Sequence, residues 1–244
     1  MARRPADVNP ERRALLNAGL AEAANLAEAL AVDFAQLLQA AVPGADHAAM
    51  RAAATLGVTR RMALAGGLAA QALGTQGFAT LAGHPSDTVR GWACYALAEQ
   101  QLPLADALDR IRPLAADGNA GVREWAWLAL RPAIAATPQD AISLLRSWTA
   151  ETDPRLRRFA TEATRPRGVW CPHITALRRD PAPGLALLEP LRADPARYVH
   201  DSVANWLNDA GKDHPVWVRG LCRRWQELPG TAPRILARAQ RNLA

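Results

Sequence analysis

Acidic, basic and indole side chains alternate in two segments of this 244-residue chain, and they are its residues best suited to chemistry. The segments are VREWAWLALRP (122–132) and RRFATEATRPRGVW (157–170). Their candidate residues are Glu124, Trp125, Trp127, Arg131, Glu162 and Arg165. A carboxylate can stabilise a developing cation or position a water molecule, an arginine fork suits phosphate, and an indole face attracts positive charge. Together these groups suit a reaction on nucleic acid, because they match its phosphates, sugars and bases.

Other catalytic chemistries lack the residues that they need. Five histidines and three cysteines form no spacing typical of a zinc site, and Cys171 and His173 are an isolated pair of possible ligands. The chain contains no phosphate-binding P-loop, no GxGxxG nucleotide motif and no GxSxG nucleophile motif. We therefore predict that the protein has no metal site.

Positive charge is concentrated in the last third of the chain. The net charge is +6, and residues 151–244 hold 16 basic and 10 acidic side chains, whereas residues 1–84 hold 7 and 6. Between Arg155 and Arg179, seven arginines accompany one acid, Glu162. Such a stripe is typical of a surface that binds a polyanion. A solvated helix face is the alternative.

The elements that position these residues are predicted to be short helices. Alanine accounts for 54 residues, against 3 Phe and 2 Tyr. Alanine is the best helix former, whereas aromatic and β-branched residues favour strands. Eighteen prolines and 16 glycines interrupt the helices often. In the N-terminal third, helices are expected over 11–18, 22–41, 47–56 and 58–73.

A pattern that recurs four times indicates that the helices form repeats. Each copy has an apolar anchor, usually followed by arginine, and then small or apolar residues at helical spacing. The anchors are Val89, Val122, Leu156 and Val199, at intervals of 33, 34 and 43 residues. This period is typical of an all-α HEAT-like solenoid of paired antiparallel helices. We predict one domain over 1–244, with N-terminal helices over 1–84 and repeats best defined over 85–228. The recurring arginines are expected to form a hydrogen-bond ladder between repeats; they are Arg90, Arg123 and Arg157.

The third interval is longer than the others because it contains an inserted loop. The insertion, TRPRGVWCPHI (164–174), holds two prolines and a glycine, which break helices. Insertions in solenoids lie on one face, which is often the binding face. We expect this loop to carry Arg165, Arg167 and Trp170 to that face.

Helical projection predicts which side chains face the binding surface. At about 100° per residue, Trp125 points toward the core, whereas Trp127 points outward with Glu124 and Arg131. The outward residues of the next two anchored helices include Arg158, Glu162, Arg165, Asn205 and Asn208. Aligned along a solenoid, they would form one curved surface with a basic concave face. The alternative is that Arg158 and Arg165 only pair with Glu162, at helical distances of four and three residues.

Three segments resemble the DNA alkylation repair glycosylases with HEAT-like repeats, the AlkC/AlkD superfamily, and most closely its AlkC branch. They are VREWAWLALRP (122–132), RRFATEATRPRGVW (157–170) and DPARYVHDSVANWLNDAGKDHP (194–215). The resemblance implies excision of positively charged alkylpurines, such as 3-methyladenine and 7-methylguanine, from double-stranded DNA without base flipping. It also implies electrostatic stabilisation of the oxocarbenium charge on the deoxyribose, and no cofactor.

The resemblance implies roles for individual residues as well. Glu124 and Glu162 match the acidic positions of the family motif, and either can be the critical carboxylate. Trp127, or else Trp125, would face the lesion. The residues expected to contact DNA are Arg158, Arg165, Arg167, Trp170, Arg131, Asn205, Asn208 and Lys212.

The remaining expectations concern location and partners. The N-terminal MARRPADVNPERR lacks the apolar segment of a secretory signal, and no stretch is apolar enough to span a membrane. We expect a bacterial cytoplasmic protein that works as a monomer, away from membranes, and joins the nucleoid when on DNA.

Two further points bear on function. Some AlkC relatives carry a C-terminal immunoglobulin-like domain, and the chain ends at Ala244 without a strand-rich segment, so contacts from such a domain are expected to be absent. Fold alone does not determine function. A non-catalytic HEAT-repeat scaffold or a nucleic-acid-binding protein is therefore the alternative.

Overall fold

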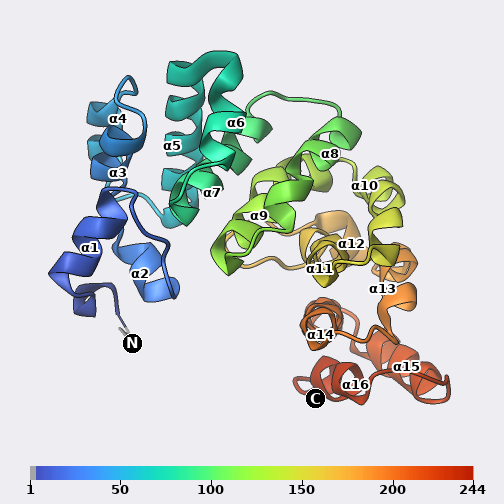
Figure 1. The fold of residues 1–244 in the computed structure, drawn as a ribbon. Coiled ribbons are helices and arrows are strands. Elements are labelled where there is room, and N and C mark those ends of the chain that lie inside the picture. The colour runs from blue at the N-terminus through green and yellow to red at the C-terminus, as the bar shows by residue number, and fades with distance from the viewer. Residues whose placement is uncertain (1–3, 244) are drawn as a thin grey trace. The chain divides into compact units, whose positions relative to one another are not determined.

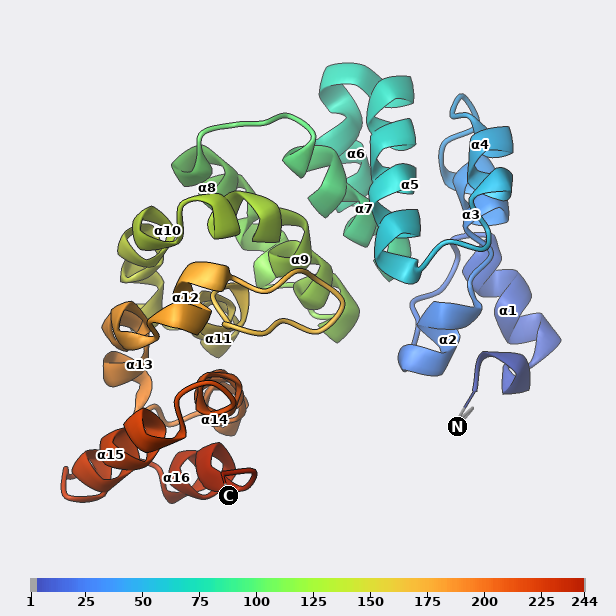
Figure 2. The same cartoon turned by 180° about the vertical axis from the view of Figure 1, so that it is seen from behind.

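The fold is built from helices throughout the part of the chain that the computed structural model describes, residues 4–243. No β-strand occurs within that range, as the alanine-rich composition predicts (Figures 1 and 2). Contacts divide the chain into two compact units, Met1–Leu130 and Arg131–Ala244, and the division falls inside helix α9 (Ala120–Ala136). The single domain and its concave face stay predictions.

The first unit consists of helices, and the first four of its α-helices begin at asparagine or aspartate caps. Its elements before α9 are η1 (Pro5–Asp7), α1 (Pro10–Asn17), α2 (Leu26–Ala31), α3 (Phe34–Ala41), α4 (His47–Ala52), α5 (Val58–Leu73), η2 (Gly74–Gln76), α6 (Gly77–Ala82), α7 (Asp87–Ala98) and α8 (Leu104–Ala115). The single helix expected over 22–41 is wrong. Asp33 accepts hydrogen bonds from the backbone amides of Ala35 and Gln36, and so begins α3 as a separate helix.

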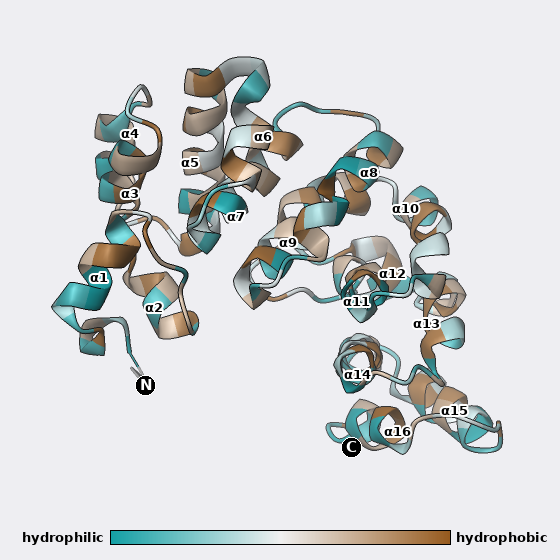
Figure 3. Ribbon diagram, viewed as in Figure 1, coloured by the Kyte–Doolittle hydropathy of each residue, from teal (hydrophilic) through white to brown (hydrophobic). Residues whose placement is uncertain are grey.

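The second unit contains the last part of α9 and the elements that follow it. These are α10 (Pro138–Leu145), η3 (Ser147–Ala150), α11 (Pro154–Ala163), α12 (Thr175–Arg179), η4 (Ala182–Gly184), α13 (Leu185–Leu191), α14 (Arg197–Gly211), α15 (Pro215–Gln226) and α16 (Pro233–Gln240). Val203 and Trp206 of α14 pack in one core with Trp225 and Ile235 from the two helices that follow. Most of the labelled helices carry both hydrophilic and hydrophobic residues (Figure 3), as amphipathic helices around a core do.

The repeat pattern is confirmed by burial and by the ladder. The anchors lie in α7, α9, α11 and α14, and each is buried: Val89, Val122, Leu156 and Val199. The arginine after each of the first three anchors donates, through Nη1, to the carbonyl oxygens six and five residues earlier, at 2.7–3.0 Å. In the fourth helix His200 contacts the carbonyl oxygen six residues earlier at 2.5 Å. Each repeat therefore closes its own entry turn in the same way.

The ladder also links consecutive repeats. Arg90 of α7 forms an ion pair at 2.8 Å with Asp117, in the turn that enters α9. Arg157 of α11 forms the equivalent pair at 2.5 Å with Asp194, in the turn that enters α14. The regular interval between anchors thus follows from a hydrogen-bonding unit that recurs.

The inserted loop lies where the sequence predicts it. Helix α11 ends at Ala163 and α12 begins at Thr175. Figure 2 shows the chain between them as a long irregular excursion. Its base is closed by a hydrogen bond from the amide of Ile174 to the carbonyl oxygen of Pro166, at 3.1 Å.

Close packing of α5 on α7 provides a stability test with a matched control. A Cβ atom at Gly66 would lie 2.7 Å from Cβ of Tyr95 and 2.8 Å from the carbonyl oxygen of Trp92, whereas one at Gly67 would meet nothing within 4 Å. We expect Gly66→Ala to lower the free energy of unfolding by about 1–3 kcal/mol, because it overfills the contact. Gly67→Ala should leave it unchanged or raise it by up to about 1 kcal/mol, through helix propensity. Urea unfolding measures both. Equal effects would contradict the α5–α7 packing.

Candidate functional site

The side chains of Arg158, Glu162 and Arg165 come together on one face of α11. Their spacing of four and three residues places them on the same side of the helix. The Glu162 carboxylate lies 3.5 Å from an Nη atom of Arg158 and 3.1 Å from an Nη atom of Arg165. Glu162 is only 2% exposed. The pairing expected as an alternative to DNA contact is therefore present, and it surrounds a buried carboxylate.

A second buried carboxylate, Asp209 of α14, extends this arrangement. Arg165 also binds Asp209 at 2.8 Å, and Lys212 approaches the same carboxylate at 3.2 Å. Side chains of opposite charge thus alternate across two packed helices, and we call this set the ionic row. It consists of Arg158, Glu162, Arg165, Asp209 and Lys212. Nearby, the hydroxyl groups of Thr161 and Ser202 share a hydrogen bond of 2.5 Å between the same two helices.

The sequence analysis missed Asp209. The residue lies one helical turn after Asn205, a position already expected to face outward, and this spacing of four was the signal that could have found it. Asn205 itself is half-buried on α14. The structure therefore adds an acid to the face that the sequence predicts to be lined with amides.

The electrostatics of the ionic row favour the charged form of Arg165. Burial disfavours the charged form of Arg165, but the adjacent carboxylates of Glu162 and Asp209 outweigh it and raise the pKa of Arg165. The guanidinium of Arg158 also stacks over the ring of Tyr198, 4.6 Å from its centroid. A guanidinium fork fits the oxygens of a carboxylate and of a phosphate alike.

Arg131 is buried, contrary to the outward orientation that helical projection predicts. It is 1% exposed and donates hydrogen bonds to the carbonyl oxygens of Ala163 at 2.9 Å, Arg165 at 2.5 Å and Pro172 at 3.4 Å. These carbonyls belong to the end of α11 and to the inserted loop, where backbone acceptors lack helical partners. Burial lowers the pKa of Arg131. Arg131 therefore anchors the loop, and its expected contact with DNA stays a prediction.

In the inserted loop, Arg167 is held in an ion pair, whereas Trp170 is exposed. Arg167 and Arg178 both bind Asp213, at 2.6 and 3.0 Å, and their hydrogen bonds hold the pKa of that carboxyl far below its usual value. Trp170 is 47% exposed and adopts a left-handed backbone conformation with φ of 62°. Non-glycine residues adopt this conformation rarely, and often at functional sites.

The amide expected at position 208 also plays a structural role. Asn208 is buried, donates to the carbonyl oxygen of Ala239 at 3.3 Å and accepts from Asn242 at 3.2 Å. It therefore holds α14 to the last helix of the unit, and its expected contact with DNA stays a prediction. Lys212, in contrast, has a side chain that is 49% exposed.

In the first unit, Glu124 and Trp127 of α9 form a pair. The indole N–H of Trp127 donates to Oε2 of Glu124 at 2.9 Å, and Trp127 is 3% exposed. Trp125 is half-buried, beside Tyr95 with ring centroids 6.3 Å apart. The projected orientations of the two tryptophans are therefore wrong. Because α9 is buried from Ala126 to Arg131, it has no outward stripe there on which Trp127 could lie.

The described residues contain neither a cluster of metal ligands nor a helix that could span a membrane. Within residues 4–243, no group of three or more His, Cys, Asp or Glu side chains is arranged to hold a metal ion. No helix in the same range combines the length and the apolar character needed to cross a membrane.

Comparisons with known proteins agree with this architecture. The family of HEAT repeats matches residues 75–165. The uncharacterized protein YhaZ of Bacillus subtilis (strain 168) is 39% identical over 118 residues, which are 47% of this chain and 32% of that protein. The chain thus spans about a third of this curated relative.

Solved structures extend the similarity to the whole chain. The alkylpurine DNA glycosylase AlkC of Pseudomonas fluorescens, bound to DNA containing an abasic site analog, is 25% identical with a TM-score of 0.70. The match covers 100% of this chain and 65% of AlkC, which is less than two thirds. AlkD2 from Streptococcus mutans is 19% identical over 80% of this chain and 87% of its own, with a TM-score of 0.55. The chain therefore has an AlkC/AlkD-like HEAT-repeat fold, as the sequence resemblance predicts.

The anchoring role of Arg131 gives a stability prediction. Arg131→Ala leaves three carbonyl oxygens without their donor, so we expect the free energy of unfolding to fall by at least about 3 kcal/mol. The control is Arg155→Ala on α11, whose side chain is 43% exposed and lies 4.0 Å from Asp153. The control should change stability by no more than about 0.5 kcal/mol. Urea unfolding provides both values. If Arg131→Ala were as mild as the control, Arg131 would not anchor the loop.

Proposed function

We propose that the protein is a DNA glycosylase that removes positively charged N-alkylated purines, of the 3-methyladenine and 7-methylguanine type, from double-stranded DNA without flipping the base. The observation that carries the proposal is the ionic row, in which Glu162 and Asp209 are buried carboxylates shared by one arginine. Similarity to AlkC, whose solved structure contains DNA, supports the same function.

The reaction requires little from the protein beyond a negatively charged group held close to the deoxyribose. Alkylation at N3 or N7 makes the base cationic, so the bond from C1′ to the base nitrogen breaks with its electron pair moving to the base. The base leaves as a neutral molecule, and positive charge develops on the deoxyribose. A carboxylate from Glu162 or Asp209 stabilises that charge and accepts a proton from the water that attacks C1′. No pocket for the base and no cofactor are required.

The arginines that cover the carboxylates also provide the DNA contact. The side chains of Arg158 and Arg165 are 14% and 13% exposed, and they lie over Glu162, which is almost fully buried. A DNA phosphate is an equally good partner for a guanidinium. We propose that phosphates draw these two arginines outward, so that binding DNA uncovers the carboxylates that act on its sugar.

The remaining exposed groups of this unit have supporting roles in the proposal. Arg167 and Lys212 bind phosphates, and Asn205 contacts phosphate or sugar. Trp170, held outward on the anchored loop, packs against a sugar or an exposed base face. The proposed enzyme acts as a monomer, in the cytoplasm and at the nucleoid.

The pair of Glu124 and Trp127 is the other candidate for the catalytic carboxylate. The Trp127 indole fixes one carboxylate oxygen of Glu124, so Trp127 is a positioning residue in this proposal. The half-buried Trp125 is the tryptophan with surface left to face a lesion. A non-catalytic HEAT-repeat scaffold or a nucleic-acid-binding protein is the second candidate function, because a buried ion-pair network would also serve to hold helices together.

Replacing the carboxylates separates these possibilities. We expect Glu162→Gln and Asp209→Asn to slow single-turnover excision of 7-methylguanine from duplex DNA by about 10²–10³-fold, the cost of losing one preorganised electrostatic contact. Excision of 3-methyladenine should slow less, because its glycosidic bond is weaker. The excision rate of Glu124→Gln tests whether Glu124 is the catalytic carboxylate instead.

The control for this experiment is Glu227→Gln, an exposed acid of the same unit, which should keep the wild-type rate. Melting temperatures identify variants that are merely unstable. If all three carboxylate variants excise both lesions at the wild-type rate, the catalytic assignment is wrong. If the wild-type protein releases no methylated purine, the scaffold is favoured.

Salt dependence tests the phosphate contacts. The side chains of Arg167 and Lys212 are 24% and 49% exposed. Neither of them is an ion-pair partner of Glu162, so their removal leaves Glu162 with both of its arginines, Arg158 and Arg165. We expect the Arg167→Ala/Lys212→Ala double variant to flatten the slope of log affinity against log salt by about 1–2. The control is Arg223→Ala, an exposed arginine of α15. An unchanged slope in the double variant would place the interface on other residues.

A further inference from the structure

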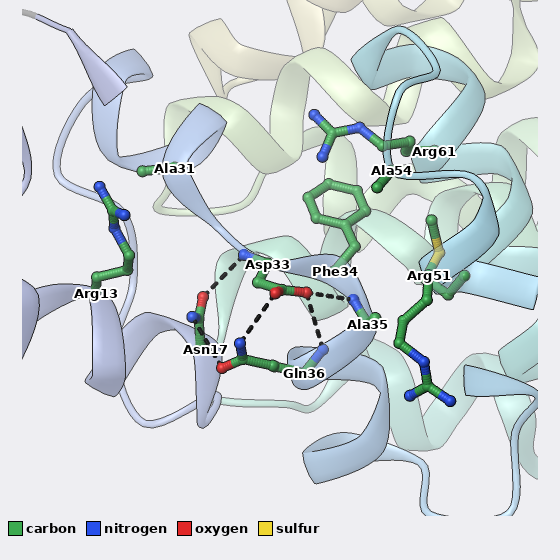
Figure 4. A pocket seen from close by; sticks show the side chains of 11 residues that line it. Arg13, Asn17, Ala31, Asp33, Phe34, Ala35, Gln36, Arg51, Ala54 and Arg61 are labelled. Carbon is green, nitrogen blue, oxygen red and sulfur yellow. Dashed lines mark hydrogen bonds between the residues drawn. The ribbon is translucent and has the colours of Figure 1, made fainter. Parts of the chain in front are cut away.

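A hollow lined by arginines lies among the first helices of the unit Met1–Leu130. It has a volume of about 380 Å³ and is bounded by residues of the first five helices. Its main polar and aromatic lining residues are Arg13, Asn17, Asp33, Phe34, Arg51 and Arg61. Figure 4 shows the guanidinium groups of Arg13 and Arg61 on either side of Ala31, with the Phe34 ring beside Arg61. We call this hollow the arginine pocket.

The arginines of the pocket lack the carboxylates that accompany other partly buried arginines, such as Arg90 and Arg165. Among residues 4–243, Arg51 and Arg61 have no hydrogen-bond acceptor and no ion pair, and Arg13 donates only to the carbonyl oxygen of Pro5, at 2.8 Å. Arg12, next to Arg13 on α1, is bound to Glu28 at 2.8 Å. The positive charge of the pocket is therefore left unbalanced where a neighbouring arginine is neutralised.

The one carboxylate in the lining is already occupied. Asp33 accepts hydrogen bonds from the amides of Ala35 and Gln36 through one oxygen, and from the Gln36 side chain at 3.0 Å through the other. Figure 4 draws these bonds, together with the contact between Asn17 and the backbone of Asp33. Asp33 is thus committed to beginning α3, and it has little capacity left for the arginines.

Two of the three arginines are held in place without being satisfied. The Nε atoms of Arg13 and Arg61 are buried and have no hydrogen-bond partner. The Arg61 guanidinium packs over the Phe34 ring, 4.8 Å from its centroid. Burying a donor without an acceptor costs about 1–3 kcal/mol. An anion in the pocket would offset that cost by its attraction to both guanidinium groups.

We propose that the arginine pocket binds a phosphoryl group, either a backbone phosphate of DNA or a free phosphate. Arg13 and Arg61 carry positive charge into the lining, which holds a single carboxylate, Asp33, and guanidinium forks fit the oxygens of phosphate. If the phosphate belongs to DNA, the site rests on the proposed function and adds an anchor outside the ionic row. If it is free, the site is independent of that function.

Two variants and one matched control test the pocket. Arg13→Ala/Arg61→Ala removes the two partly buried guanidinium groups. Ala54→Glu places a carboxylate in the lining at an exposed position, so it opposes anion binding without removing buried packing. The control is Arg60→Ala, which removes an exposed arginine next to Arg61 that does not line the pocket.

The first measurement is the binding of inorganic phosphate, by calorimetry and by thermal stabilisation, against sodium chloride at equal ionic strength. Wild-type protein and Arg60→Ala should bind phosphate saturably, and a ligand that binds only the folded state raises the melting temperature. Both pocket variants should bind it at least about tenfold more weakly, the effect of losing one charge-assisted hydrogen bond.

The second measurement is the slope of log affinity against log salt for undamaged duplex DNA. A slope flatter by about 0.9 in both pocket variants, but not in Arg60→Ala, identifies the ligand as one DNA phosphate. Lost phosphate binding with an unchanged slope identifies a free phosphate. If neither quantity differs between the pocket variants and Arg60→Ala, the proposal is overturned. Excision by the wild-type protein is measured separately, so failure of the proposed glycosylase activity is not confused with failure of the pocket.

Discussion

The burial of two carboxylates between α11 and α14 is the constraint on which the candidate site depends. A carboxylate removed from water must be paired and hydrogen-bonded, since an isolated buried charge is very costly. Arg165 meets this need for Glu162 and Asp209 at once, at 3.1 and 2.8 Å. The same arginine begins the inserted loop, and its carbonyl oxygen accepts a hydrogen bond from Arg131. The requirement for a shared cation therefore links two helices, the loop and the site.

Arginine has three different roles in this chain, and its surroundings decide which. In the ladder, it closes the turn that enters a repeat and pairs with an acid of the next turn, as Arg157 does with Asp194. Arg131 is enclosed and bound to carbonyls, so it is an internal brace. In the ionic row, the forks of Arg158 and Arg165 face buried acids. A high arginine content alone distinguishes none of these roles, because each uses the same planar fork.

Both charged features proposed to act on ligands depart from the usual balance of charge. In the ionic row, basic side chains cover buried carboxylates. In the arginine pocket, the lining contains three arginines and only one carboxylate. Elsewhere in the chain, single arginines are neutralised by single carboxylates: Arg90 pairs with Asp117, and Arg12 pairs with Glu28. Both proposals rest on the same interaction with a partner that carries phosphate, namely the attraction between a guanidinium fork and phosphate oxygens.

The sequence by itself determined the all-helical repeat fold, the four anchors, the arginine ladder and the inserted loop, because these depend on local spacing along single helices. It also grouped Arg158, Glu162 and Arg165, since residues three and four apart share a helix face. Only the tertiary structure decided that Asp209 joins Glu162 and that Trp127, Arg131 and Asn208 are buried. These outcomes depend on which helices pack around each residue. A projection of one helix separates its faces but does not say how many of them are covered.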